Sequence, residues 1–355
     1  MTLKPLEGKS RKFDAAMAGF ARNGQVSELK IQVSSASSDS NYSWQESGSK
    51  QTHLIASGTK MFAATVIQQL AEAGKLSLSD SIAKHLPNCD YANLNIQDGV
   101  DCSKKITVRD LLSHTSGIAD YYQLKRLPNK GDLALISEQD PGWSFEEAIA
   151  LARTLPAKFP PNSGKANYSF TNYQLVGRLI GAITNQSLSE VFRTKIFEPL
   201  ELSQTSLITP ENLGSYHDAS QVLIGKQKYL GARRIASLGA EGSIVSSTED
   251  TTKFIKSFFS GELISETGRD GLLANWLPIF PGIRYAAGVM SLGLPRFATR
   301  ASHRGRYLGH SGATGHFMFY DPIEKLTIVG TINQLQPSTI PLRIMASVLR
   351  VVNSA

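Results

Sequence analysis

Long hydrophobic runs and cysteines are nearly missing from this 355-residue chain. Its apolar runs fall far short of the roughly 18 residues that would predict a membrane-spanning helix. The 2 cysteines have no second Cys or His pair to complete a metal site, and no H-E-x-x-H motif occurs. A P-loop and a Rossmann glycine pattern are absent as well. The remaining composition, 41% apolar and 19% charged, is typical of a soluble globular protein that can bury a core.

An export signal is also missing from the beginning of the sequence. Residues 1–24 contain no apolar signal core, so the chain as given is expected in the cytoplasm. A leader preceding this sequence would instead place the protein in the periplasm or outside the cell. Cys89 and Cys102 lie in one loop, and a disulfide between them would fit that second environment. The sequence leaves open whether the two cysteines are joined or free.

Positive charge is in excess but scattered. The net charge of +7 and the pI near 9.3 would permit binding to nucleic acid. The densest cluster, residues 296–306, carries four arginines and one histidine, and no RNP-like aromatic pattern accompanies it. A solvated basic loop is the favoured interpretation of this cluster, with a site for an anionic group as the alternative. No nucleic-acid partner is therefore expected.

The order of the predicted elements indicates the fold. Apolar periodicity predicts strands at 28–34 and 41–48, a helix at 57–74, mostly helices over 80–275, strands at 284–294, 315–322 and 325–333, and a helix at 340–352. This order predicts an α/β (α+β) fold in which residues 1–80 and 276–355 form an antiparallel sheet flanked by helices. Residues 81–275 would form an inserted, mostly helical domain. A cleft between the two domains would be a natural binding site.

One S-x-x-K tetrapeptide stands out from four copies in the chain. Ser57 and Lys60 begin a long, mostly apolar helix, whereas the other copies lie in a strand entry, a turn and a short helix: Ser27/Lys30, Ser47/Lys50 and Ser81/Lys84. A lysine drawn into the interior loses solvation, which lowers its pKa and allows it to act as a neutral base. The helix N-terminus favours negative charge at Ser57. The alternative is an ordinary helix start with Ser57 as its cap.

Two further segments could complete a site for nucleophilic catalysis. Tyr168, Asn172 and Tyr173 lie just before a predicted helix, and His310, Ser311, Gly312 and Ala313 lie at the start of a predicted strand. Glycine would let a carbonyl substrate approach the strand edge, and the next peptide N–H would be an oxyanion donor. Taken singly, Tyr168 could equally be a loop aromatic and His310 a structural histidine.

A competing serine motif can be rejected. Residues 309–313, GHSGA, nearly match the G-x-S-x-G elbow of α/β-hydrolases, but the last glycine is Ala313. That fold also needs an acid and then a histidine well downstream of its serine. Only His316 follows Ser311, and five residues are too few for it to serve as the partner.

The chain resembles the serine β-lactamase-like superfamily in three motifs that occur in the family's order. These motifs are Ser57-Gly58-Thr59-Lys60, Tyr168-Ser169-Phe170 and His310-Ser311-Gly312. The superfamily contains class C β-lactamases, D-alanyl-D-alanine carboxypeptidases, D-aminopeptidases and family VIII carboxylesterases. The resemblance covers nearly the whole chain from about residue 28 and implies the β-lactamase/transpeptidase-like fold.

The resemblance also implies roles for individual residues. Ser57 would be the acylated nucleophile, and Lys60 and Tyr168 would share the general-base and general-acid work. The backbone N–H groups of Ser57 and Ala313 would form the oxyanion hole. The substrate would be contacted by Phe170, His310, Ser311 and Gly312, with His310 on an edge strand where other members carry a lysine. Such a mechanism needs no metal or organic cofactor.

One departure from the family pattern bears on the substrate. The asparagine of the family's Y-x-N motif is Phe170 here, and a phenyl ring cannot hydrogen-bond the acylamino group of a peptide or β-lactam. His310 in place of lysine also weakens recognition of a carboxylate, unless the arginines of 296–306 supply it. We therefore expect a carboxylesterase of short-chain acyl esters. A D-amino-acid-specific peptidase or amidase, a β-lactamase and a non-catalytic binding protein are the alternatives. The partner would be a small-molecule ester or D-peptide, and the oligomeric state stays open.

Overall fold

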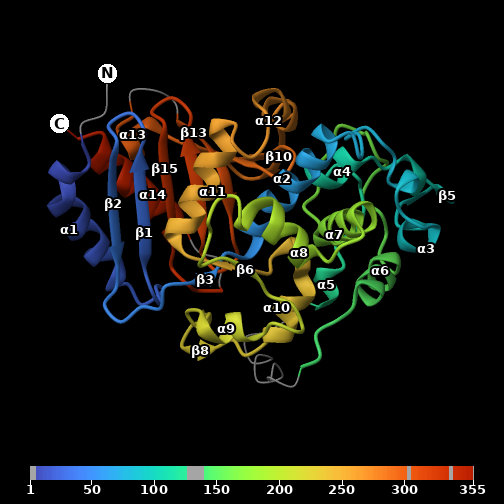
Figure 1. The fold of residues 1–355 in the computed structure, drawn as a ribbon, viewed down its shortest axis with the longest axis horizontal. Coiled ribbons are helices and arrows are strands. Elements are labelled where there is room, and N and C mark those ends of the chain that lie inside the picture. The colour runs from blue at the N-terminus through green and yellow to red at the C-terminus, as the bar shows by residue number, and fades with distance from the viewer. Residues whose placement is uncertain (1–4, 126–139, 302–304, 336–338, 355) are drawn as a thin grey trace.

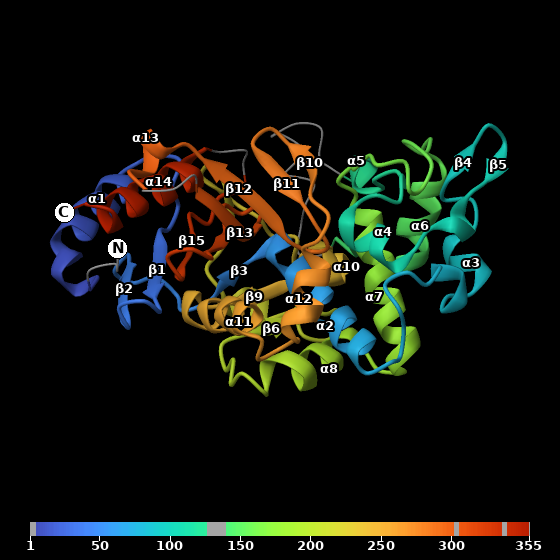
Figure 2. The same ribbon diagram turned by 90° about the horizontal axis from the view of Figure 1, so that it is seen from above.

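An eight-stranded antiparallel sheet forms one end of the molecule and a mostly helical region forms the other, as Figures 1 and 2 show. The computed structural model describes residues 5–125, 140–301, 305–335 and 339–354. The sheet takes its strands from both ends of the chain, in the order β10-β11-β12-β13-β14-β15-β1-β2. The prediction of one antiparallel sheet built from both termini is confirmed.

The strands of the large sheet have the following bounds: β1 (Lys30–Ser35), β2 (Ser40–Gln45), β10 (Leu277–Phe280), β11 (Ile283–Tyr285), β12 (Met290–Leu294), β13 (Gly305–Ser311), β14 (Phe317–Asp321) and β15 (Leu326–Thr331). A second sheet, in the order β3-β9-β6, joins β3 (His53–Leu54), β6 (Ser206–Leu207) and β9 (Ile244–Ser246). Two small hairpins pair β4 (Ile96–Gln97) with β5 (Val100–Asp101) and β7 (Leu223–Ile224) with β8 (Gln227–Lys228).

Helices cover both faces of the large sheet because its central strands are apolar on both sides. Met318 and Val329 are paired across β14 and β15 and pack with the helix α2 (Thr59–Glu72) and the helix α11 (Thr248–Ser260). The next pair, Phe319 and Ile328, belongs to the core on the opposite face. That face is covered by α1 (Ser10–Ala21) and α14 (Ile340–Val352), which pack together.

The remaining helices have these bounds: α3 (Asn88–Tyr91), α4 (Val108–Ser113), α5 (Tyr122–Lys125), α6 (Phe145–Arg153), α7 (Phe170–Thr184), α8 (Leu188–Phe192), α9 (Gly214–Asp218), α10 (Ala232–Leu238), α12 (Glu266–Leu272) and α13 (Arg296–Thr299). Short 3₁₀ turns include η2 (Ala56–Gly58) and η7 (Gly239–Glu241). In Figure 2, α3, α4, α6 and α7 gather at the end opposite α1 and α14. The helix α11, from within residues 81–275, packs on β1, β14 and β15.

Two local expectations need correction, and one question that the sequence left open is answered. Residues 284–294, expected as one strand, form β11 and β12, because the chain turns at Gly288, where φ is +76° and a Cβ would come within 2.2 Å of Ala64 Cβ on α2. The basic cluster 296–306 is not simply a loop: α13 packs against α14, and β13 begins at Gly305. Residues 302–304 of that cluster lie outside the described residues. Cys89 and Cys102 are free thiols, so the disulfide that the sequence left open is not formed.

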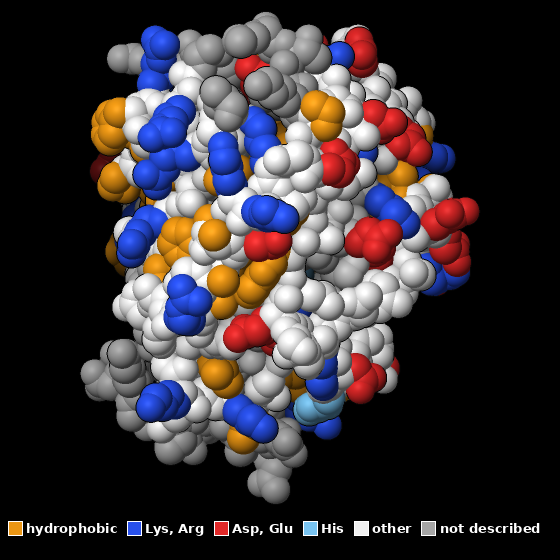
Figure 3. All heavy atoms as spheres, turned by 90° about the vertical axis from the view of Figure 1, so that its left-hand side faces the viewer, with side chains coloured by type: hydrophobic (Ala, Val, Ile, Leu, Met, Phe, Trp, Pro, Cys, Tyr) orange, Lys and Arg blue, Asp and Glu red, His pale blue; other side chains and the backbone are white. Residues whose placement is uncertain are grey.

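Charge on the surface is uneven. On the face drawn in Figure 3, Lys and Arg gather toward one side and Asp and Glu toward the other, with hydrophobic side chains between them.

Within the described ranges, no helix is both long and apolar enough to cross a membrane.

The stacked rings of Phe62 and Phe254 provide a test of the contact between α2 and α11. Both side chains are fully buried, and their ring centroids lie 3.5 Å apart, so α11 and α2 meet through this contact. We expect Phe254→Ala to lower the free energy of unfolding by about 3–5 kcal/mol, since it leaves a cavity between the two helices. Denaturant unfolding measures this loss. Phe297→Ala is the control, because Phe297 is 87% exposed and its removal should cost less than about 0.5 kcal/mol.

Candidate active site

The serine of the S-x-x-K motif lies at a tight junction between strand and helix. The short strand β3 leads into η2, which contains Ser57, and α2 follows directly. Ala56, just before the serine, has φ of +47°, a backbone conformation that is costly for a residue with a side chain and that clusters at functional sites. Ser57 is 8% exposed. Its hydroxyl is not a helix cap: Gly58 stands at the N-cap of α2, and no side-chain cap hydrogen bond forms there.

Lys60 is fully buried and faces the serine. Its Nζ donates hydrogen bonds to Ser57 Oγ at 3.2 Å and to the peptide oxygen of Glu241 at 2.6 Å. Burial lowers the pKa of Lys60 to about 8, although the carboxylates of Glu241 and Asp120 oppose this lowering. A substantial fraction of Lys60 is therefore neutral in mildly alkaline solution, and a neutral amine at this distance can accept the hydroxyl proton.

The other three S-x-x-K copies have no such arrangement. Their lysines bond to other groups: Lys30 to Glu28, Lys50 to the carbonyl oxygen of His217, and Lys84 to Asp80. The long apolar helix that follows Ser57 was therefore the feature that separated this copy from the rest.

Tyr168 comes to the serine from the helical region, two residues before α7 begins. Its hydroxyl hydrogen-bonds the Ser57 side chain, which lowers the pKa of Tyr168, but burial outweighs this and raises that pKa well above its usual range. The phenol therefore keeps its proton at neutral pH. The Tyr168 ring also lies 5.2 Å from Lys60 Nζ. The structure thus brings together the three residues predicted as catalytic.

The end of β13 closes the other side of the site. The strand pairs with β12 only as far as Gly309, opposite Met290, and with β14 as far as Ser311, opposite Phe317. The expectation of an edge strand is therefore wrong for β13 as a whole, since it has neighbours on both sides, although its last two residues extend beyond β12.

Gly312 lets the strand end approach the segment just before Ser57. A Cβ at this position would come within 2.4 Å of the carbonyl oxygen of Ile55. The next residue, Ala313, is exposed, and its peptide N–H has no hydrogen-bond partner in the part of the chain that the structure describes. Peptide N–H groups at the first turn of a helix also lack intrahelical acceptors, and Ser57 lies at such a turn. The predicted pair of oxyanion donors is compatible with this geometry.

His310 is buried behind a tyrosine rather than open to solvent. Its Nδ1 lies 2.8 Å from the carbonyl oxygen of Ser311, which can only accept, so Nδ1 carries the proton. Nε2 then accepts a hydrogen bond from Tyr285 Oη at 3.0 Å. Burial lowers the pKa of His310 to about 3, so the ring is neutral. It therefore brings no positive charge to the site. Ser311, by contrast, is partly exposed.

Phe170 places an aromatic face over the lysine. Lys60 Nζ lies 4.4 Å from the centroid of the Phe170 ring, and the other side of the ring stacks on Tyr122 with centroids 4.6 Å apart. The exposed Phe280, on β10, continues this aromatic surface 5.4 Å from the Tyr168 ring.

Sequence reasoning assigned no role to three buried polar residues that hold the site together. Asp120 accepts the peptide N–H of Phe170 at 3.1 Å and so fixes the start of α7. His114 accepts the peptide N–H of Ser169 and the amide of Asn172, and its ring lies 4.3 Å from that of Tyr168. Asn172, named as a candidate, serves here to orient His114. Glu241 is the third; its only signal was an acidic residue inside the apolar, glycine-containing stretch 238–245.

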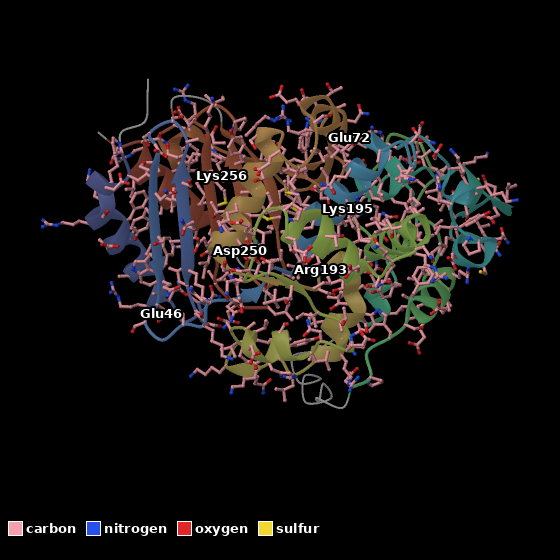
Figure 4. All side chains as sticks on the ribbon, viewed as in Figure 1. Glu46, Glu72, Arg193, Lys195, Asp250 and Lys256 are labelled. Atoms are coloured by element: carbon pink, nitrogen blue, oxygen red, sulfur yellow. The ribbon has the colours of Figure 1, made fainter. Side chains whose placement is uncertain are left out.

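Other kinds of site are not apparent near these residues. The described residues contain no cluster of three or more His, Cys, Asp or Glu side chains that could hold a metal ion. A groove of about 780 Å³ runs along α11, lined by residues that include Lys253, Lys256, Phe259 and Tyr320, but by none of the predicted site residues. Figure 4 labels Lys256 on α11.

Comparison with known proteins decides the family. The family model described as Beta-lactamase matches residues 6–346. The chain belongs to the β-lactamase family. Its fold is that of the β-lactamases and transpeptidases, and the family resemblance inferred from the three motifs is confirmed. The chain is a serine hydrolase of this superfamily.

Curated relatives in the family are similar over part of their length. A putative D-alanyl-D-alanine carboxypeptidase of Escherichia coli (strain K12) is 25% identical over 311 residues, which is 79% of this chain and 68% of the relative. Penicillin-binding protein 4 of Amycolatopsis lactamdurans is 31% identical over 154 residues, 43% of this chain and 35% of that protein. The aligned regions thus span about two thirds of the first relative and about a third of the second.

Solved structures of the same fold cover nearly the whole chain. A D-stereospecific amidohydrolase from Streptomyces sp. has a TM-score of 0.76 at 22% identity, covering 96% of this chain and 98% of its own. The D-amino acid amidase from Ochrobactrum anthropi SV3 has a TM-score of 0.75 at 20% identity, covering 97% and 98%. EstCE1, a hydrolase with promiscuous acyltransferase activity, has a TM-score of 0.73 at 17% identity, covering 98% and 99%. These likenesses establish the fold.

The contact at Gly312 predicts a sensitive position in the site. Gly312→Ala should push the strand end away from Ile55 and displace the N–H of Ala313, lowering kcat for hydrolysis by about 10²–10³ while the protein stays folded. The measurement is kcat beside the melting temperature. Gly271→Ala is the matched control, because a Cβ at Gly271 meets nothing within 4 Å. A Gly312→Ala variant with the wild-type rate would contradict this account of the strand end.

Proposed function

We propose that this protein is a carboxylesterase that hydrolyses short-chain acyl esters through an acyl-enzyme at Ser57. The observation that carries the proposal is the buried Lys60 Nζ, 3.2 Å from Ser57 Oγ. A buried amine with a lowered pKa next to a hydroxyl is the arrangement that activates a serine without a histidine.

The reaction would proceed in two steps of acyl transfer. Ser57 Oγ attacks the ester carbonyl, and its proton passes to the neutral form of Lys60. The N–H groups of Ser57 and Ala313 stabilise the tetrahedral oxyanion. The Tyr168 hydroxyl, which keeps its own proton at neutral pH, relays a proton to the departing alcohol. In the second step the same groups activate water, which releases the acid and restores Ser57.

Three features support an uncharged ester as the substrate. Phe170 offers a ring where a substrate amide would need a hydrogen-bond partner, and leaving that amide unpaired would cost about 1–3 kcal/mol. His310 is neutral and buried. The α13 segment of the arginine cluster packs on α14, on the sheet face opposite α2, so Arg296 and Arg300 lie away from Ser57.

A D-amino-acid amidase or peptidase is the second candidate. It is favoured by the similarity to the D-stereospecific amidohydrolase and to the D-amino acid amidase, and by the carboxypeptidase relative.

The nucleophile and the substrate class can be tested together. We expect kcat/KM for p-nitrophenyl butyrate to exceed that for a D-alanyl-D-alanine peptide. Ser57→Ala should lower the ester rate by about 10⁴-fold or more, because no other group replaces the attacking oxygen. If the variant kept a substantial part of the rate, the nucleophile would lie elsewhere. If the peptide were faster, the second candidate would replace the esterase.

The contribution of Phe170 can be tested by restoring an amide. Phe170→Asn should raise the peptide-to-ester ratio of kcat/KM by about tenfold, because the new side chain can hydrogen-bond a substrate amide. Phe170→Leu is the matched control: it removes the ring without adding a hydrogen-bonding group and should leave the ratio near the wild-type value. An unchanged ratio in both variants would mean that residue 170 does not select the substrate.

A further inference from the structure

Glu241 contacts Lys60, the candidate base, through its peptide oxygen, and its side chain is a buried carboxyl group. The residue ends η7 and is fully buried. Its peptide oxygen accepts the hydrogen bond from Lys60 Nζ at 2.6 Å. The peptide contact alone would not require an acidic side chain, so the carboxyl group calls for its own explanation.

A chain of buried hydrogen bonds ends at this carboxyl group. Gln174 Nε2 lies 2.9 Å from the carbonyl oxygen of Ser237, which can only accept, so the amide orientation is fixed. The same Nε2 lies 3.2 Å from Tyr121 Oη, and Trp143 Nε1 donates to that oxygen at 2.9 Å. With its oxygen accepting both donors, Tyr121 has its single hydrogen left for Glu241, whose oxygens lie at 3.1 and 3.2 Å. The Glu241 side chain therefore accepts a hydrogen bond from Tyr121, whose orientation Trp143 and Gln174 fix.

The ionisation of this carboxyl group is coupled to that of the lysine. Burial raises the pKa of Glu241 well above its usual range, and the nearby charge of Lys60 opposes that rise. In return, Glu241 is the larger of the two attractions that favour the charged form of Lys60, ahead of Asp120. A buried charge is costly without a partner of opposite sign, so the two groups determine each other's ionisation.

Other titratable groups also surround Lys60. They come from the loop after α4, from α7 and the residues before it, from the end of α4 and from β13: Asp120, Tyr173, Tyr168, His114 and His310. The two tyrosines and two histidines are held neutral, because burial raises the pKa of both tyrosines and lowers that of both histidines. Glu241 and Asp120 are the acids in this set.

We propose that Glu241, which contacts Lys60 through its peptide oxygen and whose carboxyl group Tyr121 holds in place, is a positioning residue that lets the lysine both take the Ser57 proton and return it. Two-step acyl transfer needs a base that gains and loses a proton in each half of the reaction, and such a base works best when the two forms are balanced near the working pH. Without the Glu241 carboxyl group, only Asp120 would oppose the effect of burial, and the pKa of Lys60 would fall further, which makes it a weaker base. This inference rests on the proposed function, since it assigns Glu241 a role at the same site.

The test is the pH dependence of kcat/KM for p-nitrophenyl acetate in the wild type and in Glu241→Gln. The glutamine has nearly the same shape and can still accept from Tyr121, so the fold should survive. In the wild type the rate should rise with pH through a midpoint at about 8, as Lys60 becomes neutral. In the variant the midpoint should move down by about one pH unit or more, and the plateau at high pH should fall.

Asp250→Asn is the matched control. Asp250 is also a buried acid, 3% exposed, and it accepts the peptide N–H of Gln204 and the hydroxyl of Thr205. It lies near the start of α11, where Figure 4 labels it, and is not among the groups that act on Lys60. Its replacement should leave the midpoint at the wild-type value.

The outcomes distinguish a failure of the role assigned to Glu241 from a failure of the proposed esterase function. If Glu241→Gln lowers the rate equally at every pH, or if Asp250→Asn shifts the midpoint as far, the assignment of Glu241 is overturned. If Glu241→Gln does not fold, Tyr121→Phe takes its place: it removes the bond that stabilises the carboxylate and should move the midpoint down, and an unmoved midpoint would overturn the assignment. A Ser57→Ala variant that retains the ester rate would instead overturn the proposed function.

Discussion

The burial of one ammonium group next to one hydroxyl is the constraint on which the rest of the site depends. Lys60 has no exposed surface and lies within hydrogen-bond distance of Ser57. A buried ammonium is stable only if a group of opposite charge lies near it or if it loses its proton. Lys60 meets both conditions in part. The apolar helix α2 buries the lysine, and Glu241 and Asp120 moderate the effect of that burial. The same balance that stabilises the fold around Lys60 makes it a usable base.

The rings of Tyr168 and His310 add no charge next to Lys60. Burial raises the pKa of Tyr168 and lowers that of His310, so both are neutral at the pH where Lys60 changes its protonation state. A charged residue in place of His310 would change the field at the lysine as well as the recognition of the substrate. In the proposed reaction, departures from the family motifs at Phe170 and His310 would therefore affect both the base and the recognition of the substrate.

Local pattern predicted the parts of this protein that depend on neighbours in sequence. The apolar periodicity after Ser57 singled out, among four copies of the motif, the one whose lysine is buried against its serine, and the alternating strands at both ends predicted a single sheet. Contacts between distant segments could not be read in this way. The bond between Lys60 and Glu241 spans 181 residues, and the burial of His310 depends on Tyr285, which reaches it from β11. The split of 284–294 depends on α2 passing close to Gly288. Such contacts follow from tertiary packing, which sequence periodicity does not specify.

The central claim is that Ser57 is a nucleophile activated by Lys60, and covalent labelling tests it most directly. The protein would be treated with a p-nitrophenyl phosphonate at several pH values, and the modified residue would be located by peptide mapping and mass spectrometry. We expect a single adduct on Ser57 whose rate of formation rises with pH through about 8, where Lys60 loses its proton. An adduct on another residue, no adduct at all, or a labelling rate at Ser57 that does not change over this pH range would contradict the claim.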